Sequence, residues 1–190
     1  MSTESNWNSP VRMDASERWR RQAAAMGQAI TEAIVAEAQV EAGMEVLDVA
    51  SGTGEPAISI AAQLRGSGRV VATDISSAPL RIAEQRAGER GLRNLEFVSA
   101  DAGQLPFPDA SFDRVTCRLG VMFFPDLPRA LGEMRRVLKP GGRVSLLAWG
   151  AMAQPYFAST VGTILRLMPE LKVPESVISN KVDVGISTVA

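Results

Sequence analysis

The sequence predicts an α/β protein built on a doubly wound, mostly parallel sheet. Short apolar segments alternate with longer segments of helical periodicity over most of the chain. Apolar strands that alternate with helices form parallel sheets whose two faces are both buried. Turns rich in glycine and proline separate these segments, at Gly91, at the Pro106/Pro108 loop and at Lys139-Pro140-Gly141-Gly142.

The periodicity locates each element in turn. From Asp14 to about Val40, apolar residues recur every three or four positions, which indicates one or two helices with one apolar face. After this segment, the predicted strands are Val46–Val49, Val70–Thr73, Leu95–Ser99, Asp113–Cys117 and Arg143–Trp149. The predicted helices are Ala57–Leu64, Pro79–Arg90, Leu127–Leu138 and Tyr156–Met168. We expect an N-terminal arm with helices over 1–40 as a lid or cap, a core over 41–170, and a weakly structured tail over 171–190.

The composition excludes several classes of function. The 190 residues include no histidine and one cysteine, Cys117, so the commonest general base and metal ligand is absent and no thiolate cluster can form. We therefore expect no metal site and no Ser-His or Cys-His nucleophile. Net charge is −1, which provides no basic field for nucleic acid or anionic lipid.

Hydropathy predicts a cytoplasmic protein. No apolar run approaches the ~20 residues that span a bilayer, and Met1–Pro10 lacks the basic start and apolar core of a signal peptide. We expect neither a membrane partner nor a nucleic-acid partner.

The most informative stretch is the run Glu45–Gly54. An apolar strand that carries one acid, Asp48, leads into a turn with two glycines, Gly52 and Gly54. At glycines, backbone N–H groups can approach a ligand with no Cβ in the way. A second apolar strand ends on Asp74, an acid placed to accept from both hydroxyls of a ribose. This combination predicts a site for a nucleoside-type cofactor.

The residues of the turn argue against two other nucleotide sites. With Ala57, the turn can be written as the dinucleotide pattern G-x-G-x-x-A, which is a weak signal alone. Asp48 lies inside the strand, and Glu55-Pro56 puts a negative charge and a missing N–H at the helix start, where a pyrophosphate needs free donors. The chain also contains no G-K-[ST], so a P-loop is excluded.

Further motifs follow the glycine turn in a fixed order. They are Asp74, Ser99-Ala100-Asp101-Ala102, Leu105-Pro106-Phe107, Ser111-Phe112-Asp113-Arg114-Val115 and Arg135-Arg136-Val137-Leu138-Lys139-Pro140-Gly141-Gly142. Over about residues 43 to 149, this series resembles the class I S-adenosylmethionine-dependent methyltransferases, and among them the ubiquinone/menaquinone-biosynthesis type of small-molecule methyltransferase. The resemblance implies a Rossmann-like fold with strand order 3-2-1-4-5, apparently without the family's last two strands, and S-adenosyl-L-methionine as the cofactor.

The resemblance also implies a role for each residue of the turn. Gly52 and Gly54 would let the turn backbone pack against the methionyl and ribose parts of the cofactor, together with Ala50 in the same stretch. Asp48 would orient the turn and hold the ammonium group directly or through water; alternatively it only satisfies turn amides. Asp74 would accept from the two ribose hydroxyls.

Four later residues complete the implied cofactor site. Ile75 would pack on the adenine, or be plain core. Asp101 would accept from the adenine amino group, or cap a turn, and the Ala102 N–H would face a ring nitrogen. Arg118 would place its backbone carbonyl near the cofactor's ammonium group, with a side chain that is structural or faces the acceptor. Cys117 is expected to be an inert buried thiol.

The activity that the resemblance implies is methyl transfer to a small-molecule acceptor by in-line displacement. The protein then mainly orients donor and acceptor, and no catalytic residue can be named. An alternative is a cofactor-binding module without turnover, because only about 40 residues follow Trp149. An NAD-dependent oxidoreductase is the least favoured reading.

The short C-terminal region further predicts a homodimer. In strand order 3-2-1-4-5, Arg143–Trp149 lies at the edge of the sheet, and an uncovered apolar edge is a template for pairing with another chain. A weaker alternative is that Val182–Ile186 folds back as a short substitute strand.

Overall fold

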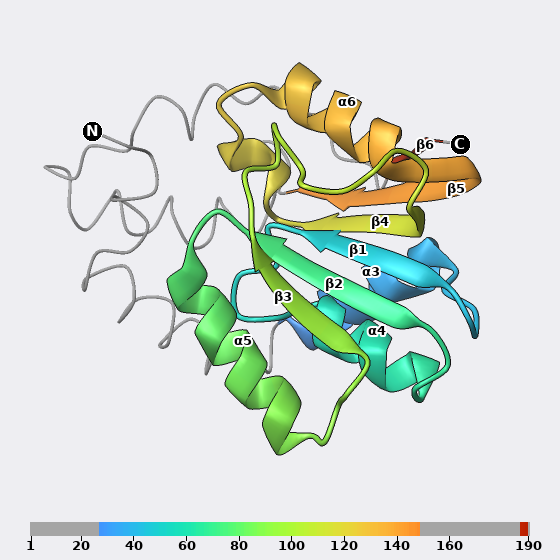
Figure 1. Cartoon of the computed structure of the whole chain (residues 1–190), viewed down its shortest axis with the longest axis vertical. Helices are drawn as coiled ribbons and strands as arrows, with labels where there is room; N and C mark the ends of the chain where they lie inside the picture. Colours follow the sequence, from blue (N-terminus) through green and yellow to red (C-terminus); the bar gives the residue numbers. More distant parts are fainter. Residues whose placement is uncertain (1–26, 149–186, 190) are drawn as a thin grey trace, which may run out of the picture. The chain divides into compact units, whose positions relative to one another are not determined.

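The structure is a computed structural model of the chain, and it describes residues 27–148 and 187–189. Five parallel strands form one sheet in the order β3-β2-β1-β4-β5, and a sixth strand, β6, continues it beyond β5 (Figure 1). The strands are β1 (Glu45–Val49), β2 (Arg69–Asp74), β3 (Leu95–Ser99), β4 (Phe112–Arg118), β5 (Leu138–Leu147) and β6 (Ser187–Val189). The predicted doubly wound, mostly parallel fold and its strand order are confirmed.

The winding of the chain reverses between two central strands. From β1 the chain moves outward through β2 to β3, and it then returns to the other side of β1 with β4. In open α/β sheets, ligands bind outside the carboxyl ends of the strands at such a switch point. We therefore expect a ligand site at the carboxyl ends of β1 and β4.

Helices bury the sheet through two hydrophobic clusters. The helices are α3 (Gln28–Ala38), α4 (Ala57–Leu64), α5 (Ser77–Glu89) and α6 (Leu127–Val137), with a short 3-10 helix, η1, at Val121–Phe123. One cluster joins Ala38, Ile60 and Ala61 to Val46 and Val70, and the other joins Met134 and Val137 to Leu47 and Val115. Neighbouring residues of β1 thus belong to different clusters, as the two-residue period of a strand requires.

Most predicted boundaries agree with the structure within two residues. The helix Ala57–Leu64 and the strand Leu95–Ser99 have the predicted bounds. Helix α5 begins at Ser77, two residues before the predicted Pro79. A proline is tolerated in the first turn of a helix, because its missing N–H would have no partner inside the helix.

The largest boundary error concerns β5. The turn Lys139-Pro140-Gly141-Gly142 was predicted to precede a strand over Arg143–Trp149, but β5 begins at Leu138 and includes that turn. The pairing register shifts there: Phe112 pairs with Leu138, and the next pair joins Arg114 to Arg143. Gly141 has φ +77°, a conformation that glycine adopts readily. The four residues are therefore a bulge inside the ladder, and a run of local turn signals cannot distinguish a bulge from a turn.

The prediction that β5 forms an uncovered edge is wrong. Strand β6 pairs antiparallel with it, joining Val144 to Val189 and Leu146 to Ser187. The pairing segment lies just after the Val182–Ile186 segment that was considered as the weaker alternative. Over these residues, the short strand β6 satisfies the backbone hydrogen-bonding groups of β5 as well as a longer strand would.

The end of the predicted N-terminal segment 1–40 packs against the rest of the protein. Helix α3 lies within the predicted lid of 1–40, but Ile34 and Ala38 are fully buried and Ala38 belongs to the cluster under α4. Arg114 on β4 donates to the Ala38 carbonyl at 2.7 Å, which ties the end of α3 to the sheet. The predicted helix Tyr156–Met168 lies outside the described residues. Of the helices in the described ranges, each is too short or too polar to cross a membrane.

Candidate functional site

Two residues with left-handed backbone angles follow the strands on either side of the switch point. Ala50 follows β1 with φ +56° and Leu119 follows β4 with φ +61°. Non-glycine residues rarely adopt such angles, and they cluster at functional sites. Gly120 lies against this pair: a Cβ built on it would be 2.5 Å from the Ala50 Cβ and 2.8 Å from the Cys117 sulfur. The ends of β1 and β4 can therefore meet closely only because residue 120 has no side chain.

The loop between β1 and α4 is held by its own backbone and by α5. Ser51 donates its N–H to the Thr73 carbonyl at 2.8 Å, and Gly54 donates to Ser51 at 2.9 Å. Arg86 on α5 donates to the Thr53 carbonyl and forms an ion pair with Glu55 at 3.2 Å. Ser59 donates to the other oxygen of Glu55 at 2.6 Å. The negative charge that disfavours a pyrophosphate is therefore neutralised within the protein.

Residues 52 and 54 of the loop are glycines for different physical reasons. A Cβ built on Gly52 would meet no atom within 4 Å, so the space beside it is open. A Cβ on Gly54 would lie 2.5 Å from Ile58 Cδ1 and 3.0 Å from the Ala83 Cβ, so the space there is filled by α4 and α5. Gly52 thus fits the predicted approach to a ligand. A side chain at Gly54 would overlap the packing between α4 and α5.

Asp74 ends β2 in a fixed orientation. Its Oδ2 accepts from the Gly52 N–H at 2.9 Å and its Oδ1 accepts from the Ser76 N–H at 3.0 Å. The residue is half-buried, and burial raises the pKa of its carboxyl while the backbone hydrogen bonds at Ser76 and Gly52 lower it. Each carboxylate oxygen has a further lone pair. The side chain can therefore accept two more hydrogen bonds from a ligand.

Asp48 lies inside the sheet, with one oxygen unpartnered. The residue is fully buried, and its Oδ1 accepts from the Thr116 hydroxyl on β4 at 2.7 Å. Its Oδ2 is buried and has no hydrogen-bond partner. Burial raises the pKa of this carboxyl to about 7. Hydrogen bonding from the Thr116 and Ser51 hydroxyls and the Ala57 N–H lowers this pKa, so groups of the protein itself partly offset the burial of the carboxyl.

Arg118, at the end of β4, is also incompletely satisfied. The residue is half-buried, its Nε is buried without a hydrogen-bond partner, and burial lowers the pKa of the guanidinium. The charges that act on it most are the carboxylates of Glu55 and Asp48 and the guanidinium of Arg86.

The loop after β3 carries the remaining predicted site residues. Ala100 donates to the Asp74 carbonyl at 2.9 Å, which places Asp101 and Ala102 beyond the end of β2. Asp101 is exposed, and its Oδ1 accepts from the Gly103 N–H at 2.8 Å, so the turn-capping alternative holds for one oxygen. Ile75 and Ala102 are half-buried, and Ala102 also packs on the cluster under α6.

Helix α6 fixes this loop through two arginines. Arg129 donates to the Gly103 carbonyl at 2.8 Å. Arg136 donates to the Phe107 carbonyl at 2.7 Å and to the Leu105 carbonyl at 3.0 Å, and it pairs with Glu133. The conformation of the loop that carries Asp101 and Ala102 therefore depends on the side chains of α6.

The structure brings most of the predicted residues to one end of the sheet and adds others. Asp48, Ala50, Gly52 and Asp74 lie at the ends of β1 and β2, and Arg118 ends β4. Sequence reasoning missed Thr116, Leu119 and Gly120. The sequence does contain a signal for Gly120, because a glycine follows the predicted strand closely. It contains no local signal for Thr116 as the partner of Asp48, because that contact depends on the register of β1 against β4. Cys117 is fully buried, as predicted, and burial raises the pKa of its thiol.

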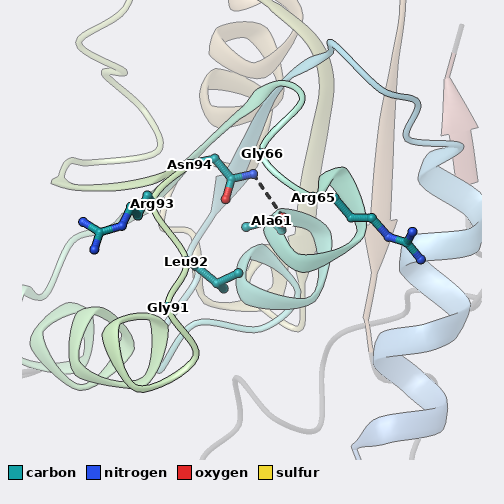
Figure 2. A pocket seen from close by; sticks show the side chains of 7 residues that line it. All are labelled: Ala61, Arg65, Gly66, Gly91, Leu92, Arg93 and Asn94. Atoms are coloured by element: carbon teal, nitrogen blue, oxygen red, sulfur yellow. Dashed lines mark hydrogen bonds between the residues drawn. The ribbon is translucent and has the colours of Figure 1, made fainter.

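A shallow cavity of about 410 Å³ lies elsewhere, between α4 and the loops before β2 and β3 (Figure 2). It is lined by Ala61, Arg65, Gly66, Gly91, Leu92, Arg93 and Asn94. In Figure 2 the side chains of Arg65 and Arg93 point away from each other, and Asn94 donates to the Ala61 carbonyl. The cavity belongs to the amino ends of the strands, and no set of charged side chains converges on it. Within residues 27–148 and 187–189, no group of three potential metal ligands occurs either.

The chain is similar in sequence to known proteins. A sequence profile described as the ubiE/COQ5 methyltransferase family matches residues 23–181. The chain is 44% identical over 121 residues to the ubiquinone/menaquinone biosynthesis C-methyltransferase UbiE of Bordetella avium, covering 64% of this chain and 47% of that protein. It is 38% identical over 160 residues to the demethylmenaquinone methyltransferase of Deinococcus radiodurans, covering 84% of this chain and 59% of that protein.

A solved structure has the same fold. A SAM-dependent methyltransferase from Aquifex aeolicus superposes with a TM-score of 0.61 at 24% sequence identity, over 72% of this chain and 77% of that one. The chain spans about half the length of the UbiE relatives it matches.

Proposed function

The chain belongs to the ubiE/COQ5 methyltransferase family, and from this premise we propose that it binds S-adenosyl-L-methionine and transfers the methyl group to a carbon of a quinone-type small molecule. The names of its relatives in Bordetella avium and Deinococcus radiodurans suggest the acceptor class. The observation that carries the proposal is the carboxylate of Asp74. Both of its oxygens are anchored by backbone N–H groups, and both keep a lone pair for the hydroxyls of a ribose.

The residues of the site fit an adenosyl cofactor with an amino-acid end. The open space beside Gly52 accommodates a ligand next to the backbone. The buried, unpartnered Oδ2 of Asp48 matches an ammonium group. Asp101 and Ala102, beyond the end of β2, are proposed to contact the adenine, with Ile75 packing beside it. Ala50 and Gly54 are proposed to shape the loop through their backbone.

In the mechanism, the side chains position the reactants. When bound, the cofactor supplies an activated methyl group on a sulfonium, so the reaction needs orientation more than acid–base catalysis. Asp74 would hold the ribose, Asp48 would hold the ammonium group, and the loop fixed by α6 would hold the adenine, so that a bound cofactor would present its methyl group to the acceptor carbon.

Calorimetry and a turnover assay test the proposal. Purified protein is titrated with S-adenosylhomocysteine and with NAD, and we expect binding of the first alone. Incubation with S-adenosyl-L-methionine and a short-chain demethylmenaquinol should release S-adenosylhomocysteine and yield the methylated product by mass spectrometry. Protein that binds NAD instead would contradict the cofactor assignment.

The alternative of a cofactor-binding module without turnover is distinguished by the same assay. Binding of S-adenosylhomocysteine with no product from any quinol would support it.

Two expectations about the whole protein stay proposals. A homodimer is no longer supported by a free edge at β5, since β6 pairs there; light scattering on a sizing column measures the oligomeric state. A cytoplasmic location is consistent with a single cysteine that forms no disulfide, and cell fractionation tests it.

A further inference from the structure

Phe123 is the large apolar side chain that stays exposed in the part of the chain that the structure describes, with an exposed fraction of 59%. Single exposed apolar residues are common on protein surfaces and need no explanation by themselves. Phe123 differs through its place, because it belongs to η1, the short helix that follows β4 at the switch point. Its ring is therefore exposed at the end of the sheet where a ligand is expected.

The short helix that carries Phe123 is anchored to the core. Phe123 donates its N–H to the Gly120 carbonyl at 2.9 Å. Val121 and Phe124 pack on the cluster under α6. Residues three apart lie on the same side of a 3-10 helix, so Val121 and Phe124 form the inner side of this turn and Phe123 lies on the outer side. The exposed ring thus has a fixed support.

The same turn begins directly against the loop between β1 and α4. A Cβ built on Gly120 would be 2.5 Å from the Cβ of Ala50, the first residue of that loop. A 3-10 helix rises about 2 Å per residue, so Phe123 follows Gly120 by roughly 6 Å. A methyl acceptor must come within about 3–3.5 Å of the group that it receives, which requires it to lie beside the cofactor. Phe123 is therefore within reach of an acceptor that lies next to the loop.

The chain around Phe123 is apolar and uncharged. Leu119–Pro125 contains no side chain with a nitrogen or an oxygen atom. Such a surface offers an acceptor contact area, and an aromatic ring adds a preference for offset-stacked or edge-to-face geometry. A sugar or an amino acid would find no hydrogen-bond partner among these side chains. The segment therefore favours a neutral, planar aromatic acceptor.

We propose that Phe123 is a specificity-determining residue that selects a neutral aromatic acceptor by contact between rings. The proposal rests on the proposed function, because it assumes a methyl acceptor beside the cofactor. It goes further, since it names the residue that recognises the acceptor and makes the selectivity depend on aromatic character.

Binding of two matched alcohols to protein saturated with S-adenosylhomocysteine tests the proposal. 1-Naphthol is aromatic, and decahydro-1-naphthol has the same carbon skeleton and hydroxyl without aromatic rings. By calorimetry, the wild type should bind 1-naphthol more tightly than the saturated alcohol. Phe123→Leu should reduce this preference by roughly 2- to 10-fold, which is the usual strength of an aromatic pair expressed as a ratio of affinities. Phe123→Tyr keeps a ring and should retain the preference.

A second phenylalanine provides the matched control. Phe97→Leu makes the same change on β3, at the opposite edge of the sheet, and should leave the preference at the wild-type value. Both variants of Phe123 should keep the wild-type affinity for S-adenosylhomocysteine and the wild-type melting temperature, because the ring is exposed. In turnover, Phe123→Leu should raise KM for a short-chain demethylmenaquinol and leave kcat close to that of the wild type.

Four outcomes would overturn the proposal. If Phe123→Leu keeps the wild-type preference, another residue recognises the ring. If the wild type binds the two alcohols equally, the segment selects for apolar area and not for aromatic character. If it binds neither alcohol while S-adenosylhomocysteine is bound, Phe123 does not face an aromatic acceptor. If Phe123→Leu melts well below the wild type, the ring is structural. A wild type that fails to bind S-adenosylhomocysteine would instead contradict the proposed function, so the two failures are distinguishable.

Discussion

Replacing Asp48 with asparagine should change how the stability of the ligand-free protein depends on pH. Burial raises the pKa of this carboxyl to about 7 in the folded protein, against an ordinary pKa of 3.8 for aspartate. Between these values the folded state holds a proton that the unfolded state has lost. The free energy of unfolding therefore falls as the pH rises through this window, and it levels off above pH 7. Asp48→Asn removes the titrating group, so it should remove this part of the pH dependence.

The magnitude follows from the width of the window. Between pH 5 and pH 8, about two pH units lie below the folded-state pKa, and each contributes about 1.4 kcal/mol. The wild type should therefore lose about 3 kcal/mol of stability relative to Asp48→Asn over this range. The asparagine places an amide donor where Oδ2 had no partner, which costs about 1–3 kcal/mol. That cost is the same at both pH values, so it cancels from the comparison.

Urea unfolding at pH 5, 6, 7 and 8 measures the effect. The quantity to follow is the difference in unfolding free energy between the two proteins, because every other titrating group is common to both. Saturating S-adenosylhomocysteine should flatten the difference, since an ammonium group beside Asp48 favours its charged form. If the difference stays constant from pH 5 to pH 8 without ligand, Asp48 is ionised throughout and the reasoning about its burial is wrong.

The remaining predictions concern the loops. Asp74→Ala should weaken binding of S-adenosylhomocysteine by about 5- to 150-fold and also lower the melting temperature, because the Gly52 and Ser76 amides lose their acceptor; unchanged affinity by calorimetry would contradict the ribose assignment. Gly52→Ala should cost about 1–2 kcal/mol of stability, whereas Gly54→Ala should cost more, since its Cβ would lie 2.5 Å from Ile58; equal urea midpoints would refute this. Arg136→Gln should cost about 1–3 kcal/mol through the carbonyls it leaves unpaired, while the exposed neighbour Arg135→Gln serves as a control that keeps wild-type stability.

The sequence was sufficient for the fold and for the residues that end strands. Periodicity located the parallel strands because each is a short apolar run between helices, and the motifs gave the order of strands through the resemblance. Asp74 was readable because a carboxylate at the end of the second strand has a local signature. The bulge at Lys139–Gly142 was not readable, because a turn and a bulge use the same residues.

What the sequence could not predict depends on pairing between distant segments. The hydrogen bond from Thr116 to Asp48 requires the register of β1 against β4. Residue 54 is a glycine because Ile58 and Ala83 fill the space beside it, and this contact joins distant segments. The pairing of β6 with β5 joins positions more than 40 residues apart. Local propensity carries no information about such contacts.

The anchoring of Asp74 has a consequence for the way a ligand arrives. Its carboxylate is oriented, and the turn at Gly52 is held, by hydrogen bonds that exist without any ligand. Ordering a residue from a disordered state costs roughly 1–2 kcal/mol in conformational entropy, and here folding has already met that cost. The proposed ribose site is thus preorganised, so we expect a ligand to associate by simple collision with it. Substitutions far from this site that loosen the turn would lower affinity without removing a single contact to the ligand.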